Sequence, residues 1–277
     1  MYYAQTGRYD AGTGRDKEKY QKFHKSDSLN PYLYCENNPA TYTDPRGTTL
    51  EDYYTTNSGQ NDPVQVTISG DTITIDAYVD ITGDVNYAVG NSTAHDLVIE
   101  GIEEWAGSYW VFGHSVTVDV NVYEGHKSKW SWLPWVSSQN YVDIELITGP
   151  GVAHTAISNP WDISDPGIIT MYTEFDGGRG PRDDWDYRNT ITHEWGHVMG
   201  IDDGYADING STTRPLAAML ESYDVMVDNH DPNAKVSSLD IQMMVMAAST
   251  KELQYFMAYD GHKQSRGVVT YGPCTQH

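Results

Sequence analysis

The amino-acid sequence predicts an α+β domain over residues 64–277, on the strength of three observations. Between residues 64 and 175, several segments alternate β-branched with polar residues, a period of two that is typical of half-buried strands. Other segments combine helix-capping residues with apolar residues at helical spacing. Strands come first in the chain, two helices flank further strands, and a helix comes last, an order that favours an α+β arrangement.

The strands are predicted from alternation and from turn residues. Residues 64–83 contain two alternating runs joined at Gly70 and Asp71, which predicts a hairpin. Further strands are predicted at residues 115–125, 141–149 and 167–175.

The first predicted helix covers residues 91–107. It opens with Asn, Ser and Thr, which favour helix N-termini, and we expect Gly107 to end it. Its apolar residues are Leu97, Ile99, Ile102 and Trp105.

Three more helices are predicted further along the chain. The helix at residues 183–200 opens with aspartates, which suit the positive end of a helix dipole. A short helix is predicted at 215–223 and a final one at 236–256. We expect Ser238 to cap the final helix, and its apolar stripe consists of Ile241, Met244 and Val245.

The chain is strongly acidic, which limits the classes of partner. It has 39 Asp and Glu against 17 Lys and Arg, a formal charge of -22. Such a surface repels a phosphate backbone, so we expect no nucleic-acid partner. No apolar run approaches the length of a membrane span, and the first residues do not resemble a signal peptide. We therefore expect synthesis in the cytoplasm without a signal peptide, and secretion or delivery by another route.

The two cysteines, Cys35 and Cys274, lie near opposite ends of the chain. Two cysteines form no disulfide framework. Two separate thiols and one long-range bridge are both open at this point.

The first 50 residues differ from the rest in composition. They have a high density of Lys and Arg and several turn-forming Asn-Pro and Asp-Pro pairs, whereas residues 51–63 are rich in Asp, Asn, Ser and Gly. We therefore divide the chain into an N-terminal segment, 1–50, a linker, 51–63, and the domain 64–277.

The N-terminal segment resembles the end of the Rhs repeat-associated core over residues 2–47. The resemblance lies in the stretches GRYDAGTGR and LNPYLYCENNPATYTDPRG. In that family the core closes a β-cage, and a variable C-terminal domain follows, usually a toxin. The resemblance implies a polymorphic toxin effector, delivered by the parent Rhs cage and its secretion system, with a cognate immunity protein as partner.

Residues 192–204, THEWGHVMGIDDG, contain the groups that point to chemistry. His193 and His197 are four residues apart, so on a helix both imidazoles share one face. Glu194 stands beside the first histidine. An HExxH motif on a helix gives zinc two nitrogen ligands and places a general base beside the metal.

The residues after the motif supply a third ligand. A helix cannot return a later side chain to the same metal unless the chain turns sharply, and Gly200 stands where that turn is needed. Asp203 then falls at the third-ligand position. Asp202, next in the chain, and Glu221, on a predicted downstream helix, are the alternatives for this role.

The full motif, HExxHxxGxxD, resembles that of the metzincin metallopeptidases in the variant with Asp as third ligand. The resemblance covers residues 64–256 and implies a twisted mixed sheet with residues 167–175 as edge strand, a zinc-binding helix, a methionine turn and a C-terminal helix. Met226 in YDVMVD fits the methionine turn. Asp228 stands where some members have an oxyanion-stabilising tyrosine, and the alternatives for that role are Tyr205, Tyr223 and His230.

These residues predict a zinc-dependent endopeptidase acting on proteins or peptides. Two histidines and one carboxylate leave a zinc position for water, as catalytic sites do. Zinc lowers the pKa of that water towards about 7, and Glu194 accepts its proton and passes it to the leaving amine.

A second cation, calcium, is a further candidate ligand. Some metzincins bind calcium near the active cleft, and the acidic run at residues 175–186 offers Asp176, Asp183, Asp184 and Asp186. We favour the alternative, a solvated loop that starts the helix, because the EF-hand pattern is absent.

Three other functions stay open on the sequence. One is a binding module stabilised by a structural metal, and another is a secreted protease that is not a toxin. The third is a nuclease, which the acidic composition disfavours. Replacing Glu194 distinguishes an enzyme, which loses turnover, from a structural site, which keeps its zinc and loses nothing.

Overall fold

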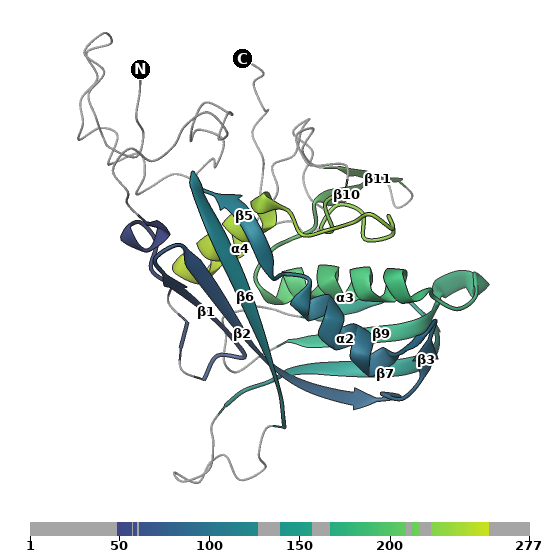
Figure 1. Cartoon of the computed structure of the whole chain (residues 1–277). Coiled ribbons are helices and arrows are strands. Elements are labelled where there is room, and N and C mark those ends of the chain that lie inside the picture. The colour runs from purple at the N-terminus through teal and green to yellow at the C-terminus, as the bar shows by residue number, and fades with distance from the viewer. Residues whose placement is uncertain are drawn as a thin grey trace.

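The computed structural model describes residues 49–254, except 57, 60, 127–138, 157–166, 209–211 and 216–222, and only the backbone of 205–208 and 212–215. It shows a mixed β-sheet with few helices, consistent with the predicted α+β class (Figure 1). The helical elements are η4 (Leu50–Asp52), α2 (Ala94–Glu103), η5 (Asp176–Gly178), α3 (Asp184–Val198) and α4 (Ser238–Thr250). The strands are β1 (Val64–Ser69), β2 (Thr72–Gly83), β3 (Ala88–Val89), β4 (Ser92–Thr93), β5 (Gly107–Val111), β6 (His114–Glu124), β7 (Val142–Gly151), β8 (His154–Ala156), β9 (Ile168–Phe175), β10 (Tyr205–Ile208) and β11 (Thr212–Pro215).

The main sheet has seven strands in the order β5-β6-β2-β7-β9-β8, with β1 also paired to β2. Its central strands β6, β2, β7 and β9 are parallel, whereas β1, β5 and β8 pair antiparallel with their neighbours. The predicted hairpin is confirmed, because β1 and β2 are joined through Gly70, whose φ of 61° suits glycine.

Among the strands that the structure describes, β8 rather than β9 lies at the edge of the sheet beside α3. β9 pairs with β7 on one side and with β8 on the other, so the expectation that residues 167–175 form the edge strand is wrong. β8 consists of three residues, too few for alternation to reveal a strand in the sequence.

The core lies between one face of the sheet and the helices. Along β2, Ile73, Ile75, Ala77 and Val79 are fully buried, while the residues between them are only half-buried, as the two-residue period requires. The same buried cluster includes apolar residues of α2, α3 and α4. The helices therefore bury the apolar face of the sheet.

α2 and α3 pack against each other closely. A Cβ at Gly101 would collide with Ile191 of α3, so only glycine allows this approach. The hydroxyl of Thr192 donates to the Gly101 carbonyl at 2.9 Å, and the Trp105 indole donates to the Thr192 carbonyl at 3.1 Å. These contacts fix the helix that carries the HExxH motif.

The start of α2 agrees with the prediction, but its end does not. Thr93 caps its start, accepting from the Asp96 amide at 3.1 Å, in agreement with the sequence. The helix ends at Glu103, however, and Gly107 begins β5 rather than ending the helix. Ile99 is half-buried, because Val98 takes the fully buried position on the inner face.

The C-terminal helix α4 is confirmed, with its cap one residue earlier than expected, but it ends at Thr250 and the described residues 251–254 of the predicted range 236–256 are not helical. Ser237 caps it, and Asp240 bonds back to the Ser237 amide to complete a capping box. Ser238 instead accepts a hydrogen bond from the Trp110 amide of β5 at 3.1 Å. The predicted apolar stripe, Ile241, Met244 and Val245, is fully buried.

The segment predicted as a linker packs against the domain where the structure describes it. Tyr54 stacks on Phe112 with ring centroids 4.4 Å apart, and the buried Asp62 pairs with Lys251 at 2.9 Å; Leu50, the last residue of the predicted N-terminal segment, is also fully buried. The Rhs-like residues 2–47, residues 216–222 of the helix predicted at 215–223, and both cysteines lie outside the described residues, whereas Pro215 belongs to β11 and Tyr223 to a turn. Among the described helices, none combines the length and the apolar character that a membrane crossing requires.

Candidate metal centre

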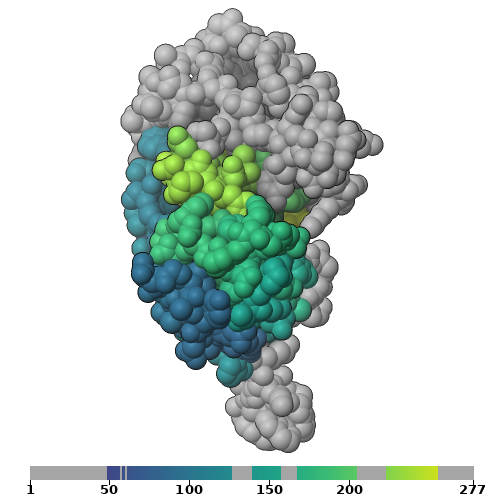
Figure 2. Space-filling model, turned by 90° about the vertical axis from the view of Figure 1, so that its right-hand side faces the viewer, coloured from purple at the N-terminus to yellow at the C-terminus, as the bar shows by residue number. Residues whose placement is uncertain are grey.

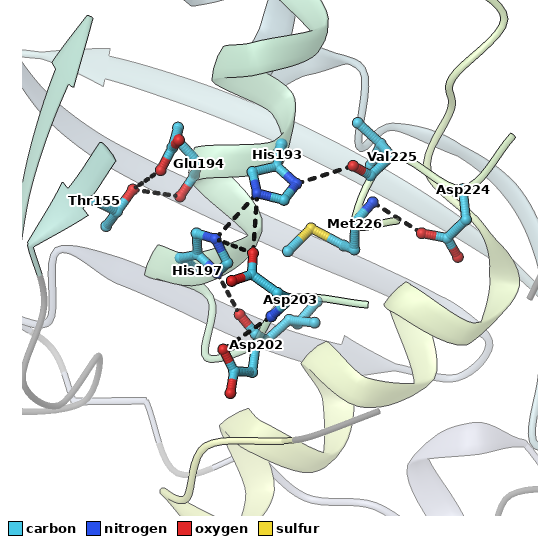
Figure 3. Close-up of polar contacts among 10 residues, drawn as sticks. Thr155, His193, Glu194, His197, Asp202, Asp203, Asp224, Val225 and Met226 are labelled. Atoms are coloured by element: carbon cyan, nitrogen blue, oxygen red, sulfur yellow. Dashed lines mark hydrogen bonds and ion pairs between the residues drawn. The ribbon is translucent and has the colours of Figure 1, made fainter. Parts of the chain in front are cut away.

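Three side chains converge on one point beside α3 (Figure 3). The Nε2 atoms of His193 and His197 are 3.2 Å apart, and Oδ1 of Asp203 lies 3.3 Å from the first and 3.2 Å from the second. Within the part of the chain that the structure describes, this is the group of His, Cys, Asp or Glu side chains placed to hold a metal ion.

Both imidazoles are held in the orientation that metal binding needs. His193 Nδ1 is 2.9 Å from the Val225 carbonyl, and His197 Nδ1 is 2.8 Å from the Ile201 carbonyl. A carbonyl only accepts, so each Nδ1 carries the hydrogen and each Nε2 is available as the ligand atom. Two Nε2 lone pairs and a carboxylate facing one point require a cation or a proton between them.

The spacing of the three atoms fits zinc. In a tetrahedral site with bonds of about 2.0–2.1 Å, neighbouring ligand atoms are about 3.3 Å apart. The three distances observed, 3.2, 3.2 and 3.3 Å, match one face of such a tetrahedron. Two imidazole nitrogens and one carboxylate oxygen are also a ligand set that catalytic zinc uses.

The chain reaches this arrangement through a tight turn after α3. The Gly200 amide donates to the His197 carbonyl and the Ile201 amide to the Gly196 carbonyl, both at 3.0 Å, the two bonds of a Schellman motif. Gly200 has a φ of 87°, which favours glycine. The predicted turning role of Gly200 is thus what the backbone shows, and it brings Asp203 back to the histidine pair.

A second turn, residues 224–227, supports the site from the other side. Its Val225 carbonyl orients His193, and its Met226 carbonyl accepts from the Gly204 amide at 2.8 Å, next to Asp203. The Met226 side chain is fully buried against α3, where a Cβ at Gly196 would collide with its sulfur. This turn therefore contacts both ends of the ligand-bearing segment.

Glu194 lies beside the histidine pair and is 6 % exposed. Its Oε2 accepts a hydrogen bond from the hydroxyl of Thr155 on β8 at 2.7 Å. Thr155 was not predicted as a site residue, because nothing in GVAHTAISNP marks it. Its neighbour His154 is exposed and bonds the Val152 carbonyl instead.

The other residues considered from the sequence are the alternative third ligands and the residues that could stabilise the oxyanion. Asp202 is turned away from the pair, and its Oδ1 accepts from the Asp203 amide at 2.9 Å. Glu221 and the side chain of Tyr205 lie outside the described residues. Tyr223 is 45 % exposed. The Nδ1 atom of His230 lies 2.7 Å from Asp186, and Asp186 precedes His193 by seven residues in the chain.

The four aspartates proposed for calcium do not come together as a ligand group. Asp183 stands at the N-cap position of α3 without a side-chain capping hydrogen bond, and Asp184 accepts from the Trp185 amide at 2.8 Å. Asp186 is buried between Arg182, at 2.6 Å, and His230. Asp176 accepts from the Gly177 amide in its own turn. The calcium hypothesis is therefore unsupported, because the described structure does not group these carboxylates, and Asp176, Asp184 and Asp186 are engaged in local amide bonds or a buried ion pair.

The surface around α3 is built from distant parts of the chain. Viewed towards the end at which α3 begins, the yellow-green surface of the segment after residue 222 lies directly against the green surface of η5 and α3 (Figure 2). Asn189 of α3 donates to the Asp231 carbonyl at 3.0 Å, which agrees with this view. The loop after Met226 thus follows α3 back towards its N-terminus.

The protonation states of the site depend on one another. Burial lowers the pKa of His197, but the hydrogen bond and charge of Asp203, with the charge of Glu194, outweigh burial and raise it from 6.5 to about 9. Burial opposes ionisation of Asp203, yet hydrogen bonds from both histidines hold its pKa well below the usual range. Without metal, a proton therefore occupies the place that a cation would take.

In comparisons with known proteins, no family model matches the chain and no curated protein is similar to it in sequence. The function is therefore inferred from the site itself.

Proposed function

We propose that the domain is a zinc-dependent endopeptidase. The observation that carries this proposal is the convergence of His193 Nε2, His197 Nε2 and Asp203 Oδ1 within 3.3 Å of one another, with both Nδ1 atoms bonded to carbonyls. A buried glutamate stands beside them, in the position of a general base.

The residues divide the work of hydrolysis between them. His193, His197 and Asp203 would hold the zinc, which supplies Lewis acidity towards the carbonyl oxygen and the attacking water. Because Thr155 occupies Oε2 of Glu194, the other carboxylate oxygen is left to take a proton from the water. Glu194 then gives that proton to the nitrogen of the breaking C–N bond, so that a carboxylic acid and an amine leave.

The edge strand favours an extended peptide as substrate. β8 pairs with β9 along one side and packs against α3 through Thr155. Main-chain groups on the other side of such an edge can pair with a peptide in extended conformation. A peptide bound there would pass directly beside Glu194, which suits cleavage inside a chain.

We further propose that the domain is a metzincin-like peptidase with Asp203 as third ligand and Met226 as its methionine turn. The supporting features are the Schellman turn at Gly200 and the burial of Met226 beneath the histidines. From the N-terminal resemblance we also propose delivery as the toxin tip of an Rhs protein, with an immunity protein as partner.

The experiment combines metal analysis with an unbiased substrate search. We expect the purified protein to bind one zinc per chain and His197→Ala to bind none tightly. Zinc-loaded wild type and Glu194→Gln are each incubated with a proteome-derived peptide library, and new termini are counted by mass spectrometry. New termini from wild type alone are expected, and equal patterns from both proteins would refute the enzyme proposal in favour of a structural metal.

The toxin proposal has a separate test. The domain is expressed from a repressible promoter in bacterial cytoplasm, with Glu194→Gln as matched control. Growth arrest by wild type but not by the variant is expected, and equal growth of the two strains would favour a protease that is not a bacterial toxin.

A further inference from the structure

We propose that Thr155 is a positioning residue that fixes the carboxylate of the general base Glu194, an inference that rests on the function proposed above. The Thr155 hydroxyl lies 2.7 Å from Glu194 Oε2 and 3.1 Å from the Glu194 backbone carbonyl (Figure 3). The two residues are far apart in the chain and come from β8 and α3.

The hydroxyl has one hydrogen, and the shorter contact takes it. An O–H donor to an ionised carboxylate forms a bond of about 2.5–2.7 Å, stronger than a neutral one. Without that hydrogen, two oxygens 2.7 Å apart would repel each other, so Thr155 must donate to Glu194. The backbone carbonyl at 3.1 Å takes at most a minor share.

Thr155 is a firm anchor for a flexible side chain. It is paired in register with Ile169 of β9, which is fully buried in the core, and its β-branched side chain has few rotamers. Glutamate has many rotamers and loses much entropy when it is fixed in one of them. The hydrogen bond to Thr155 therefore restricts the Glu194 carboxylate to one position relative to the sheet.

The bond also selects which oxygen does the chemistry. With Oε2 engaged, Oε1 is the atom left for proton transfer. Glu194 follows His193 directly in α3, and Figure 3 shows it beside the two histidines. Thr155 thus places the base next to the metal position without belonging to the ligand set.

The test compares Thr155→Val, which replaces the hydroxyl with a methyl group of similar size, with Thr155→Ser, which keeps the hydroxyl. Thr74→Val is the matched control, because Thr74 is a half-buried strand residue of β2 on the outward face of the sheet. Kinetics use the peptide that wild type cleaves best in the library. We expect kcat of Thr155→Val to fall about 10- to 100-fold with little change in KM, and Thr155→Ser and Thr74→Val to stay within about 3-fold of wild type.

A second readout is independent of turnover. Crystal structures of the metal-free variants should show the Glu194 carboxylate displaced in Thr155→Val and unmoved in Thr155→Ser. Zinc content and unfolding temperature confirm folding, and Thr155→Ala replaces the valine variant if that fails to fold. A valine variant with wild-type kcat, or with its carboxylate in place, overturns the proposal. If wild type cleaves no peptide, the proposed function fails, and the crystal structures still decide the role of Thr155.

Discussion

The contact between Gly196 and Met226 offers a direct test of how the turn at 224–227 supports the metal centre. In Gly196→Ala, the new Cβ would collide with the sulfur of Met226 and lie 2.9 Å from its methyl carbon and 3.2 Å from Trp105. All three residues are buried, so the space must come from repacking of the Met226 side chain or from a shift of the turn or of the helix.

The expected energy has two opposing parts. Overpacking a core costs about 1–3 kcal/mol, whereas alanine is about 1 kcal/mol more favourable than glycine inside a helix. In the wild-type background we therefore expect Gly196→Ala to destabilise by up to about 2 kcal/mol, or to lower Tm by up to about 8 °C. In a Met226→Ala background the collision is gone, so the same change should stabilise by up to about 1 kcal/mol.

The assay is urea unfolding of the four metal-free proteins in a double-mutant cycle. The coupling free energy between the two sites should be about 1–3 kcal/mol. A zinc titration of the same proteins should show affinity falling about 10-fold or more in Gly196→Ala, because the shifted turn carries the carbonyl that orients His193. If Gly196→Ala has the same effect in both backgrounds, the packing of Met226 against the helix is not what requires glycine.

Three further predictions concern the charged groups. Asp203→Ala should weaken zinc binding about 100-fold or more, whereas Asp202→Ala should change it little. Both affinities are measured by competition with a chromogenic chelator. The opposite result, a large loss in Asp202→Ala alone, would make Asp202 the ligand. Since the pKa of His197 is raised from 6.5 to about 9 in the metal-free protein, its contribution to stability should be complete below pH 6.5 and be lost as pH rises through 9. Zinc binding at neutral pH should accordingly release about one proton, seen by calorimetry in buffers of different ionisation enthalpy, and no buffer dependence would contradict the assignment. Asp186→Asn should destabilise by about 3–5 kcal/mol, because it leaves Arg182 buried without its charge partner, and a loss below about 1 kcal/mol in urea unfolding would argue against that role.

The sequence predicted best those features that a short stretch of chain determines by itself. Alternation over residues 64–83 gave the β1–β2 hairpin, and the apolar stripe of 236–256 gave α4. The helix over 183–200, the turn at Gly200 and the grouping of His193, His197 and Asp203 follow from spacing within a single stretch of chain. Local geometry is enough for these features because every partner lies within a few residues.

The failures concern contacts that depend on distant residues. β8 has three residues and exists because β9 offers it a partner, so neither the strand nor the contact of Thr155 with Glu194 has a local signal. Gly107 begins β5 because α2 ends earlier, at Glu103, once Trp105 enters the core. Ser237 rather than Ser238 caps α4 because the Ser238 hydroxyl is bonded to the amide of Trp110 on another strand.

The turn at 224–227 has a consequence for the order of events during synthesis. All three candidate metal ligands precede it in the chain, yet the carbonyl that orients His193 and the methionine packed beneath the helix come only with the turn. In a chain that is still emerging from a ribosome or passing through a pore, the candidate ligands are present before the Val225 carbonyl and the Met226 side chain that support them. Under the function proposed above, the domain would stay inactive until the turn at 224–227 has been made and has folded, which would protect the compartment in which it is made.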